Sequence, residues 1–168
     1  MALRYVGRFA TTRAKLRSYL ARKLRERGWD GAREPDLAAM ADRFAAQGYV
    51  DDSAYALAKS QALTGRGYGK NRVVQTLRAA GVEESEASAA HDHAEEEAVS
   101  AALRFARRRR VGPFAVTAVT DPKERERQLA AMVRAGHGFA LSRTIVALPP
   151  GQELDFDQLN ERTRLNDE

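Results

Sequence analysis

The sequence contains no cysteine, and this absence excludes disulfide bonds and thiolate chemistry. Proline occurs at only 5 of 168 positions, and aromatic residues make up only 7% of the chain. No apolar run approaches the roughly 20 residues that a membrane-spanning helix needs. The first residues, MALRYVGRFATTR, are too charged for a signal peptide. We therefore expect a soluble cytoplasmic protein.

Hydrophobic residues make up 43% of the chain, and alanine supplies a large share of them. β-branched residues rarely alternate with polar ones, whereas apolar residues recur at helical spacing, and this pattern predicts an all-α protein. Many small and few large apolar side chains suit thin layers of helices better than one thick core.

Residues 48–82 show the clearest helical pattern. Gly48 is placed to end one helix, and Asp51–Ser53 supplies the short oxygen-bearing side chains that begin the next. In that helix Ala54, Ala58 and Ala62 recur every four residues. The helix ends at Thr64–Gly67, and a further one follows and ends at Gly81. The predicted inner face of this further helix consists of Val73, Val74, Leu77 and Ala80.

A large apolar residue followed four positions later by glycine ends several predicted helices. The pairs are Leu24 and Gly28, Leu77 and Gly81, and Met132 and Gly136, at intervals of 53 and 55 residues, with Phe44 and Gly48 between the first two. This periodicity predicts three tandem three-helix repeats that stack into an elongated, curved, solenoid-like body. The predicted parts are residues 1–30 (a first repeat shortened at its N-terminus), 36–82 (the second repeat), 83–148 (the third repeat plus a final helix) and 149–168 (an acidic, flexible tail).

Basic residues are concentrated in separate segments, although the net charge is only +5. Residues 1–30 hold nine Lys and Arg against two acids, residues 104–110 hold five Arg, and residues 149–168 hold six acids and two Arg. Arginine forms bidentate contacts with phosphates and carboxylates, so it suits both nucleic-acid and protein partners. The candidate binding residues are Arg13, Lys15, Arg17, Arg22 and Lys23 near the start, Arg66, Lys70 and Arg72 at the joint between two helices, and Arg107, Arg108, Arg109 and Arg110.

Each of the two later groups also has a structural interpretation. The joint GRGYGKN at residues 65–71 could be a turn in which glycine supplies the backbone angles. The four arginines could end a helix, where cations meet the negative end of the helix dipole. For the joint this interpretation is compatible with binding, whereas for the four arginines contact with phosphates or acidic side chains is the alternative.

Catalytic and metal-binding patterns are missing from the sequence. The joint lacks the first glycine of a phosphate-binding loop, because Thr64 stands there, and Asn71 replaces the required Ser or Thr. His91 and His93 are two positions apart, which directs their rings away from each other on a helix, so a solvated face is favoured over a metal site. We therefore predict a protein that is not an enzyme and has no cofactor or metal.

The turn GYVDD, followed by RGYGKNRVVQTLRAAGV, resembles the central repeat of the RecX family of RecA regulators. The shared features are a Gly-Tyr-aliphatic-Asp-Asp turn, a basic Gly-x-Gly joint about one helix later, and a short helix ending in Leu-x-x-x-Gly-aliphatic. The resemblance implies tandem three-helix repeats and a regulator that binds RecA and RecA–DNA filaments in the filament groove. It implies inhibition of recombinase activity in DNA repair, recombination and the SOS response.

The partners implied are therefore the RecA filament and single- or double-stranded DNA, contacted through phosphates by a monomer. Two alternatives stay open from the residues alone. The chain could be a general basic DNA-binding helical module, or a helical scaffold whose partner is a protein only. Affinity for naked DNA against RecA-coated DNA separates the first alternative from the family's function.

Overall fold

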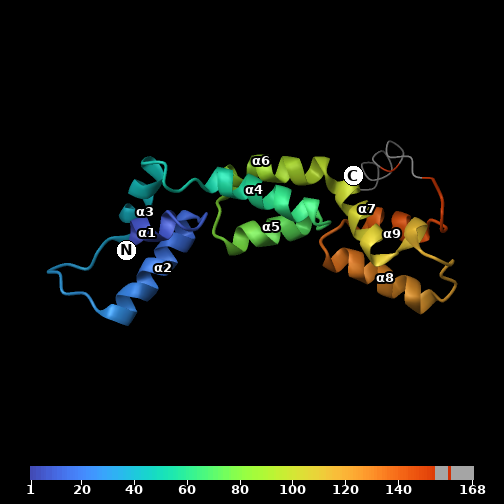
Figure 1. The fold of residues 1–168 in the computed structure, drawn as a ribbon, viewed down its shortest axis with the longest axis horizontal. Helices are drawn as coiled ribbons and strands as arrows, with labels where there is room; N and C mark the ends of the chain where they lie inside the picture. Colours follow the sequence, from blue (N-terminus) through green and yellow to red (C-terminus); the bar gives the residue numbers. More distant parts are fainter. Residues whose placement is uncertain (154–158, 160–168) are drawn as a thin grey trace. The chain divides into compact units, whose positions relative to one another are not determined.

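The structure is a computed structural model, and it describes residues 1–153 and 159 (Figure 1). These residues form nine α helices, one short 3-10 helix and no strand, which confirms the predicted all-α class. The helices are α1 (Ala2–Val6), α2 (Arg13–Arg27), α3 (Leu37–Ala46), α4 (Asp52–Gly65), α5 (Lys70–Ala79), α6 (Glu84–Glu96), α7 (Ala98–Arg109), η1 (Gly112–Phe114), α8 (Pro122–Arg134) and α9 (Phe139–Ala147). None of the helices within this described part is long and apolar enough to cross a membrane.

Short side chains that carry an oxygen cap the N-termini of four of these helices. Thr12, Asp36, Asp51 and Asp121 accept backbone N–H groups at the starts of α2, α3, α4 and α8. The first N–H groups of a helix have no partner within it, so an oxygen at this position satisfies one of them. Pro122, which has no N–H to satisfy, occupies the first turn of α8.

The pairs of large apolar residue and glycine mark helix ends in a specific way. The glycines Gly48, Gly81 and Gly136 have φ values of 76°, 69° and 97°. In each case the residue after the glycine donates its N–H to the carbonyl of the large apolar residue, which is the Schellman arrangement. The pairs are Tyr49 with Phe44 (2.9 Å), Val82 with Leu77 (3.1 Å) and His137 with Met132 (3.3 Å). The predicted helix ends are therefore confirmed, while the number of repeats, their stacking and their boundaries stay a prediction.

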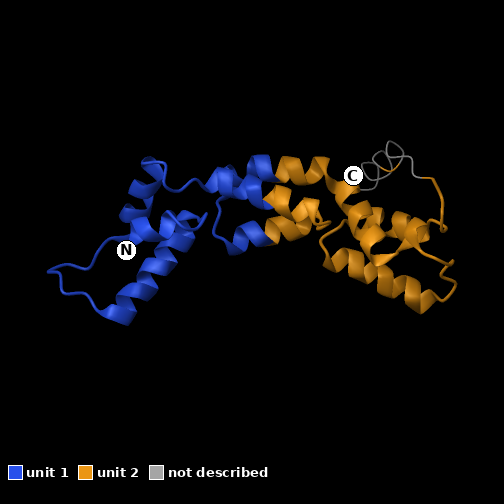
Figure 2. Cartoon of the chain, viewed as in Figure 1, with its two compact units in different colours: residues 1–59, 76–90 blue, residues 60–75, 91–168 orange. Residues whose placement is uncertain are grey.

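The chain divides into two compact units, coloured separately in Figure 2. Unit 1 comprises residues 1–59 and 76–90, and unit 2 comprises residues 60–75 and 91–168. The division passes through α4, α5 and α6, so each of these helices contributes residues to both units.

Unit 1 has a small core between α2 and α3. Leu16 and Leu20 of α2 pack with Ala41 of α3 and with Val50, and α1 packs on the same helix α2. The partly buried rings of Tyr5 and Tyr19 pack against this cluster. Aromatic side chains therefore enlarge a core that contains few large buried residues.

Unit 2 has the larger core, formed by α7, α8 and α9. Phe105 of α7, Met132 of α8 and Ile145 of α9 are buried in one cluster. Leu159, which lies in the predicted tail, is buried in the same cluster. The rest of that tail beyond Glu153 lies outside the described residues.

Candidate functional site

The backbone of the joint between α4 and α5 packs directly against the backbone of two other parts of unit 2. A Cβ atom at Gly67 would lie 2.9 Å from the backbone nitrogen of Phe105, and one at Gly69 would lie 2.3 Å from the carbonyl oxygen of Gly136. The N–H of Gly69 donates to Ala135 O at 3.0 Å. The structural interpretation of the joint predicted that glycine supplies backbone angles, and Gly67 does so at φ 79°. The close packing of Gly67 and Gly69 was not predicted, and it fixes the position of the basic residues around them.

His137 connects the α8–α9 joint to the α4–α5 joint from inside unit 2. Its Nε2 lies 3.1 Å from the carbonyl oxygen of Gly67, and its ring packs edge-on against Phe105 with centroids 5.5 Å apart. A carbonyl only accepts, so Nε2 carries a proton, and the lowered pKa of the ring leaves it neutral at pH 7. Burial lowers the pKa of His137 to about 4, although the hydrogen bond to Gly67 opposes the shift.

Two basic segments that are distant in the sequence meet in unit 2. The guanidinium of Arg108, at the end of α7, donates to the carbonyl oxygen of Arg66 in the α4–α5 joint. The guanidinium carbons of Arg66 and Arg72 lie 5.7 and 5.9 Å from the centroid of the Tyr68 ring. Arg108 and Arg109 lie 5.6 and 5.9 Å from the centroid of Phe105. We call Arg66, Arg72, Arg108 and Arg109 the basic surface of unit 2.

The side chains of this basic surface are exposed but supported. All four arginines are exposed, and each lies beside an aromatic ring of unit 2. Guanidinium groups held over rings lose less freedom when they bind an anion than unsupported ones do. Arg107 lies 4.8 Å from the ring of Phe114, and Arg110 ends α7 with a left-handed backbone at φ 56°. Arg110 is exposed as well.

Lys70, also predicted to bind, differs from the arginines of the joint. Its Nζ lies 2.5 Å from Oε2 of Glu95, and both side chains are about half exposed. An exposed pair of this kind is worth little stability, but it lowers the positive charge that Lys70 presents to a partner.

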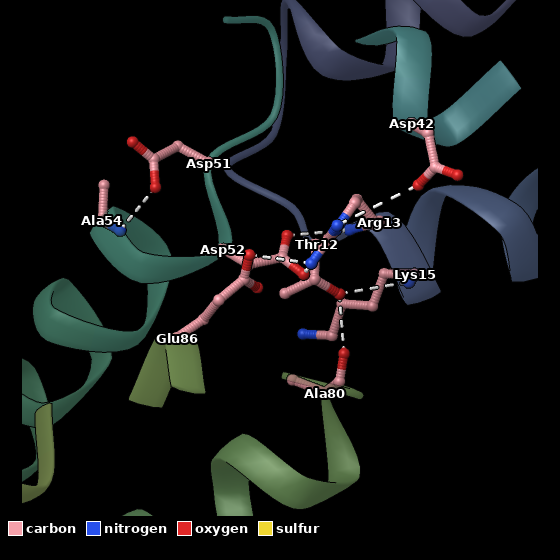
Figure 3. A network of polar contacts seen from close by, with 9 residues as sticks. All are labelled: Thr12, Arg13, Lys15, Asp42, Asp51, Asp52, Ala54, Ala80 and Glu86. Carbon is pink, nitrogen blue, oxygen red and sulfur yellow. Dashed lines mark hydrogen bonds and ion pairs between the residues drawn. The ribbon is translucent and has the colours of Figure 1, made fainter. Parts of the chain in front are cut away.

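Arg13, the first of the predicted binding residues near the start, lies within a polar network of unit 1 (Figure 3). Its guanidinium lies 3.5 Å from Asp52, 2.7 Å from Glu86 and 4.0 Å from Asp42, on α4, α6 and α3. Burial would lower the pKa of Arg13, but the charges of Glu86 and Asp52 raise it above its ordinary value. This cation therefore joins helices of unit 1.

Thr12 and Asp52 hold the start of α2 in the same network. Thr12 Oγ1 donates to the carbonyl oxygen of Ala80 at 2.6 Å and accepts from the backbone nitrogen of Lys15 at 3.1 Å. Asp52 Oδ1 accepts from the backbone nitrogen of Arg13 at 2.9 Å. The start of α2 is thus joined to the end of α5 and to the start of α4 (Figure 3).

Three other predicted cations near the start also have partners within unit 1. Lys15 Nζ donates to the Tyr55 hydroxyl at 2.5 Å. Arg22 and Lys23 both pair with Glu26, at 2.9 and 2.6 Å, one turn along α2. Arg17 is exposed. The structure thus joins Arg66, Arg72 and Arg108 into one surface but does not gather the cations near the start in the same way.

Metal ligands are not grouped in the part of the chain that the structure describes. No cluster of three or more His, Asp or Glu side chains there could hold a metal ion. His93 Nδ1 lies 3.1 Å from the hydroxyl of Ser60 on α4, so this ring contributes to helix packing.

A known protein is similar to this chain over most of its length. The chain is 31% identical to the Regulatory protein RecX of Myxococcus xanthus (strain DK1622) over 159 residues, which cover 89% of this chain and 83% of the relative. No family model matches the sequence, and no solved structure matches it. Because the identity extends over most of both chains, together with the GYVDD turn and the basic joint, the chain belongs to the RecX family.

Proposed function

We propose that this chain is a regulatory protein that binds RecA and RecA–DNA filaments and limits recombinase activity. Membership of the RecX family is the observation that carries the proposal. The relative from Myxococcus xanthus is named a regulatory protein, and the family resemblance at residues 48–82 gives RecA as the target. The regulation would take place in the cytoplasm, during repair and recombination.

The basic surface of unit 2 supports this proposal. Its four exposed arginines come from two segments about 40 residues apart, and Arg108 is fixed to the backbone of Arg66. A nucleoprotein filament presents phosphates as well as protein carboxylates, and arginine recognises both through paired N–H groups. The surface is therefore suited to a filament that presents both kinds of anion.

The mechanism that we favour is occupancy of the filament groove. The chain binds along the filament, contacts DNA phosphates and neighbouring recombinase subunits, and thereby blocks surfaces that assembly or strand exchange requires. It carries out no reaction of its own and needs no cofactor. Its effect then depends on how much of the filament is covered.

Affinity for RecA-coated against naked single-stranded DNA tests the proposal. We expect the chain to bind the coated strand at least tenfold more tightly at the same salt concentration, because protein and phosphate contacts add. Replacing Arg66 and Arg72 with Gln should reduce that preference, whereas replacing the exposed Arg33 and Arg43 of unit 1 with Gln provides a control with the same change of charge. Equal affinity for both forms of DNA would instead favour a general DNA-binding module.

A further inference from the structure

A basic hollow of about 570 Å³ lies in unit 1, between α1 and α2. Its lining contains five cations, Arg4, Arg8, Lys15, Arg22 and Arg25, and three aromatic rings, Tyr5, Phe9 and Tyr19. The remaining lining residue is Ser18, so no carboxylate faces the hollow. Most of these residues were not among the predicted binding residues.

The rings of the hollow form a series of contacts. Tyr5 and Tyr19 are stacked, with centroids 4.0 Å apart and an angle of 10° between their planes. Phe9 follows, 5.6 Å from Tyr5 and tilted by 45°. Tyr5 and Tyr19 pack against the core of unit 1, but Phe9 is 55% exposed. A large flat ring is therefore presented to solvent at one end of a fixed aromatic stack.

Three of the five cations are available to a ligand. The side chains of Arg4, Arg8 and Arg25 are exposed and make no hydrogen bond or ion pair with another residue that the structure describes. Lys15 and Arg22 differ, because they contact Tyr55 and Glu26. The hollow thus combines uncompensated positive charge with an exposed ring.

We propose that this hollow binds single-stranded nucleic acid, with a base stacked on Phe9 and the adjoining phosphates held by Arg4, Arg8 and Arg25. Single-stranded nucleic-acid sites combine a positive groove with rings on which unpaired bases stack. A duplex keeps its bases stacked internally and would leave Phe9 unused. An acidic peptide would satisfy the arginines but offers no flat ring. This site needs no recombinase, so it goes beyond the function proposed above.

Fluorescence anisotropy with a labelled oligothymidylate and no recombinase present tests the proposal. Phe9→Ala should weaken binding about fivefold or more, the effect of losing one stacked base. The same variant should bind an abasic strand of equal length as the parent does, since that strand has phosphates but no bases. Replacing Arg4 and Arg8 with Gln should weaken binding to both strands and lower the salt slope by roughly 0.7 for each lost phosphate contact.

Trp29→Ala is the matched control, because Trp29 is also an aromatic residue of unit 1, 52% exposed, but lies outside the hollow. It should leave oligothymidylate binding unchanged. Phe9→Leu keeps apolar bulk beside Tyr5 and should show the same loss as Phe9→Ala while melting at the parent's temperature.

Three outcomes would overturn the inference. The two Phe9 variants could bind oligothymidylate as the parent does, or could lose affinity for both strands equally. The variants of Phe9, Arg4 and Arg8 could also weaken only the binding of RecA filaments, which would show that the hollow binds an acidic protein surface. If the chain fails to bind RecA but its binding of oligothymidylate depends on Phe9, Arg4 and Arg8 as expected, the proposed function is wrong and the inference about the hollow holds.

Discussion

The backbone nitrogen of Arg13 donates a hydrogen bond to Oδ1 of Asp52, 2.9 Å away and 39 positions later in the chain. The two carboxylates of the Asp-Asp turn therefore act at different helices. Asp51 accepts from Ala54 N at 2.8 Å and begins its own helix α4. Asp52, whose side chain is only 2% exposed, satisfies the start of α2 and pairs with the guanidinium of Arg13 (Figure 3).

This division predicts unequal costs for replacing the two carboxylates. Asp52→Ala should lower the free energy of unfolding by about 2 kcal/mol or more, because it leaves the N–H of Arg13 without its acceptor and removes the most buried of the three carboxylates around the guanidinium. Asp51→Ala removes only a helix cap and should cost about 1 kcal/mol. Urea denaturation of the two variants measures both values. Equal, small losses would show that the Asp52 contact contributes little.

The packing of the α4–α5 joint predicts opposite effects for two neighbouring glycines. Gly69→Ala should destabilise unit 2 by roughly 1–3 kcal/mol, because its Cβ would overlap the backbone of Gly136. Gly65→Ala has no neighbour within 4 Å and ends a helix, so it should leave stability unchanged or raise it by up to about 1 kcal/mol. Thermal melts compare them directly. A stable Gly69→Ala protein would mean that the two joints do not pack this closely.

His137 predicts a specific dependence of stability on pH. The folded protein binds the proton only near pH 4, whereas an unfolded histidine binds it near pH 6.5, so the unfolded state takes up more protons in between. Stability contributed by His137 is therefore full above about pH 6.5 and falls as the pH decreases towards 4, by up to about 3 kcal/mol.

His137→Gln is the control for this pH dependence, because glutamine can donate to Gly67 O but does not titrate in this range. The difference in unfolding free energy between parent and variant should shrink or reverse between pH 7 and pH 4.5. A difference that stays constant over this range would contradict the assignment of a buried, neutral ring.

Much of the secondary structure could be predicted because its causes are local. The cap at Asp51 and the glycine ends of the helices depend on residues within about one turn of each other. Of the inner face predicted for the helix that ends at Gly81, Val73 and Leu77 of α5 and Ala80 directly after it are buried, whereas Val74 is only partly buried. These positions are large or regularly spaced enough for helical periodicity to identify them.

The orientation of α4 shows where local patterns were insufficient. Ala54, Ala58 and Ala62 recur regularly but are exposed, whereas the buried face carries Tyr55, Ala56, Ser60 and Thr64. Small polar residues in a helix interface do not contribute to a hydrophobic pattern in the sequence. The buried hydroxyl of Thr64 donates a hydrogen bond to the carbonyl oxygen of Ser60 at 3.0 Å, so it needs no contact with water. Burial was therefore set by tertiary packing.

The polar contacts between distant residues could not be predicted for the same reason. Asp52 and Arg13, or Arg108 and Arg66, are 39 and 42 positions apart, and no local pattern states which cation meets which oxygen. The sequence indicated that both basic segments were candidates, but only the packing of α7 on the α4–α5 joint joins them into one surface.

The candidate cations of the joint should contribute to binding more than to folding. Replacing Arg66, Lys70 and Arg72 with Ala should change stability by less than about 0.5 kcal/mol each, because all three side chains are exposed. Leu77→Ala is the opposite case and should cost about 2–5 kcal/mol, because Leu77 is only 1% exposed. Circular dichroism during urea unfolding distinguishes them. A triple variant that unfolds as readily as Leu77→Ala would show that the joint serves folding.

RecA-dependent ATP hydrolysis on single-stranded DNA, followed while the chain is titrated in, tests the proposed regulation most directly. The parent should slow hydrolysis at or below one copy per recombinase. A variant with Arg66, Arg72 and Arg108 changed to Gln should be fully folded and need about tenfold more protein for the same effect, because it loses phosphate and carboxylate contacts. An unchanged rate with the parent chain, using a recombinase from the same source, would contradict the proposal that this protein restrains RecA.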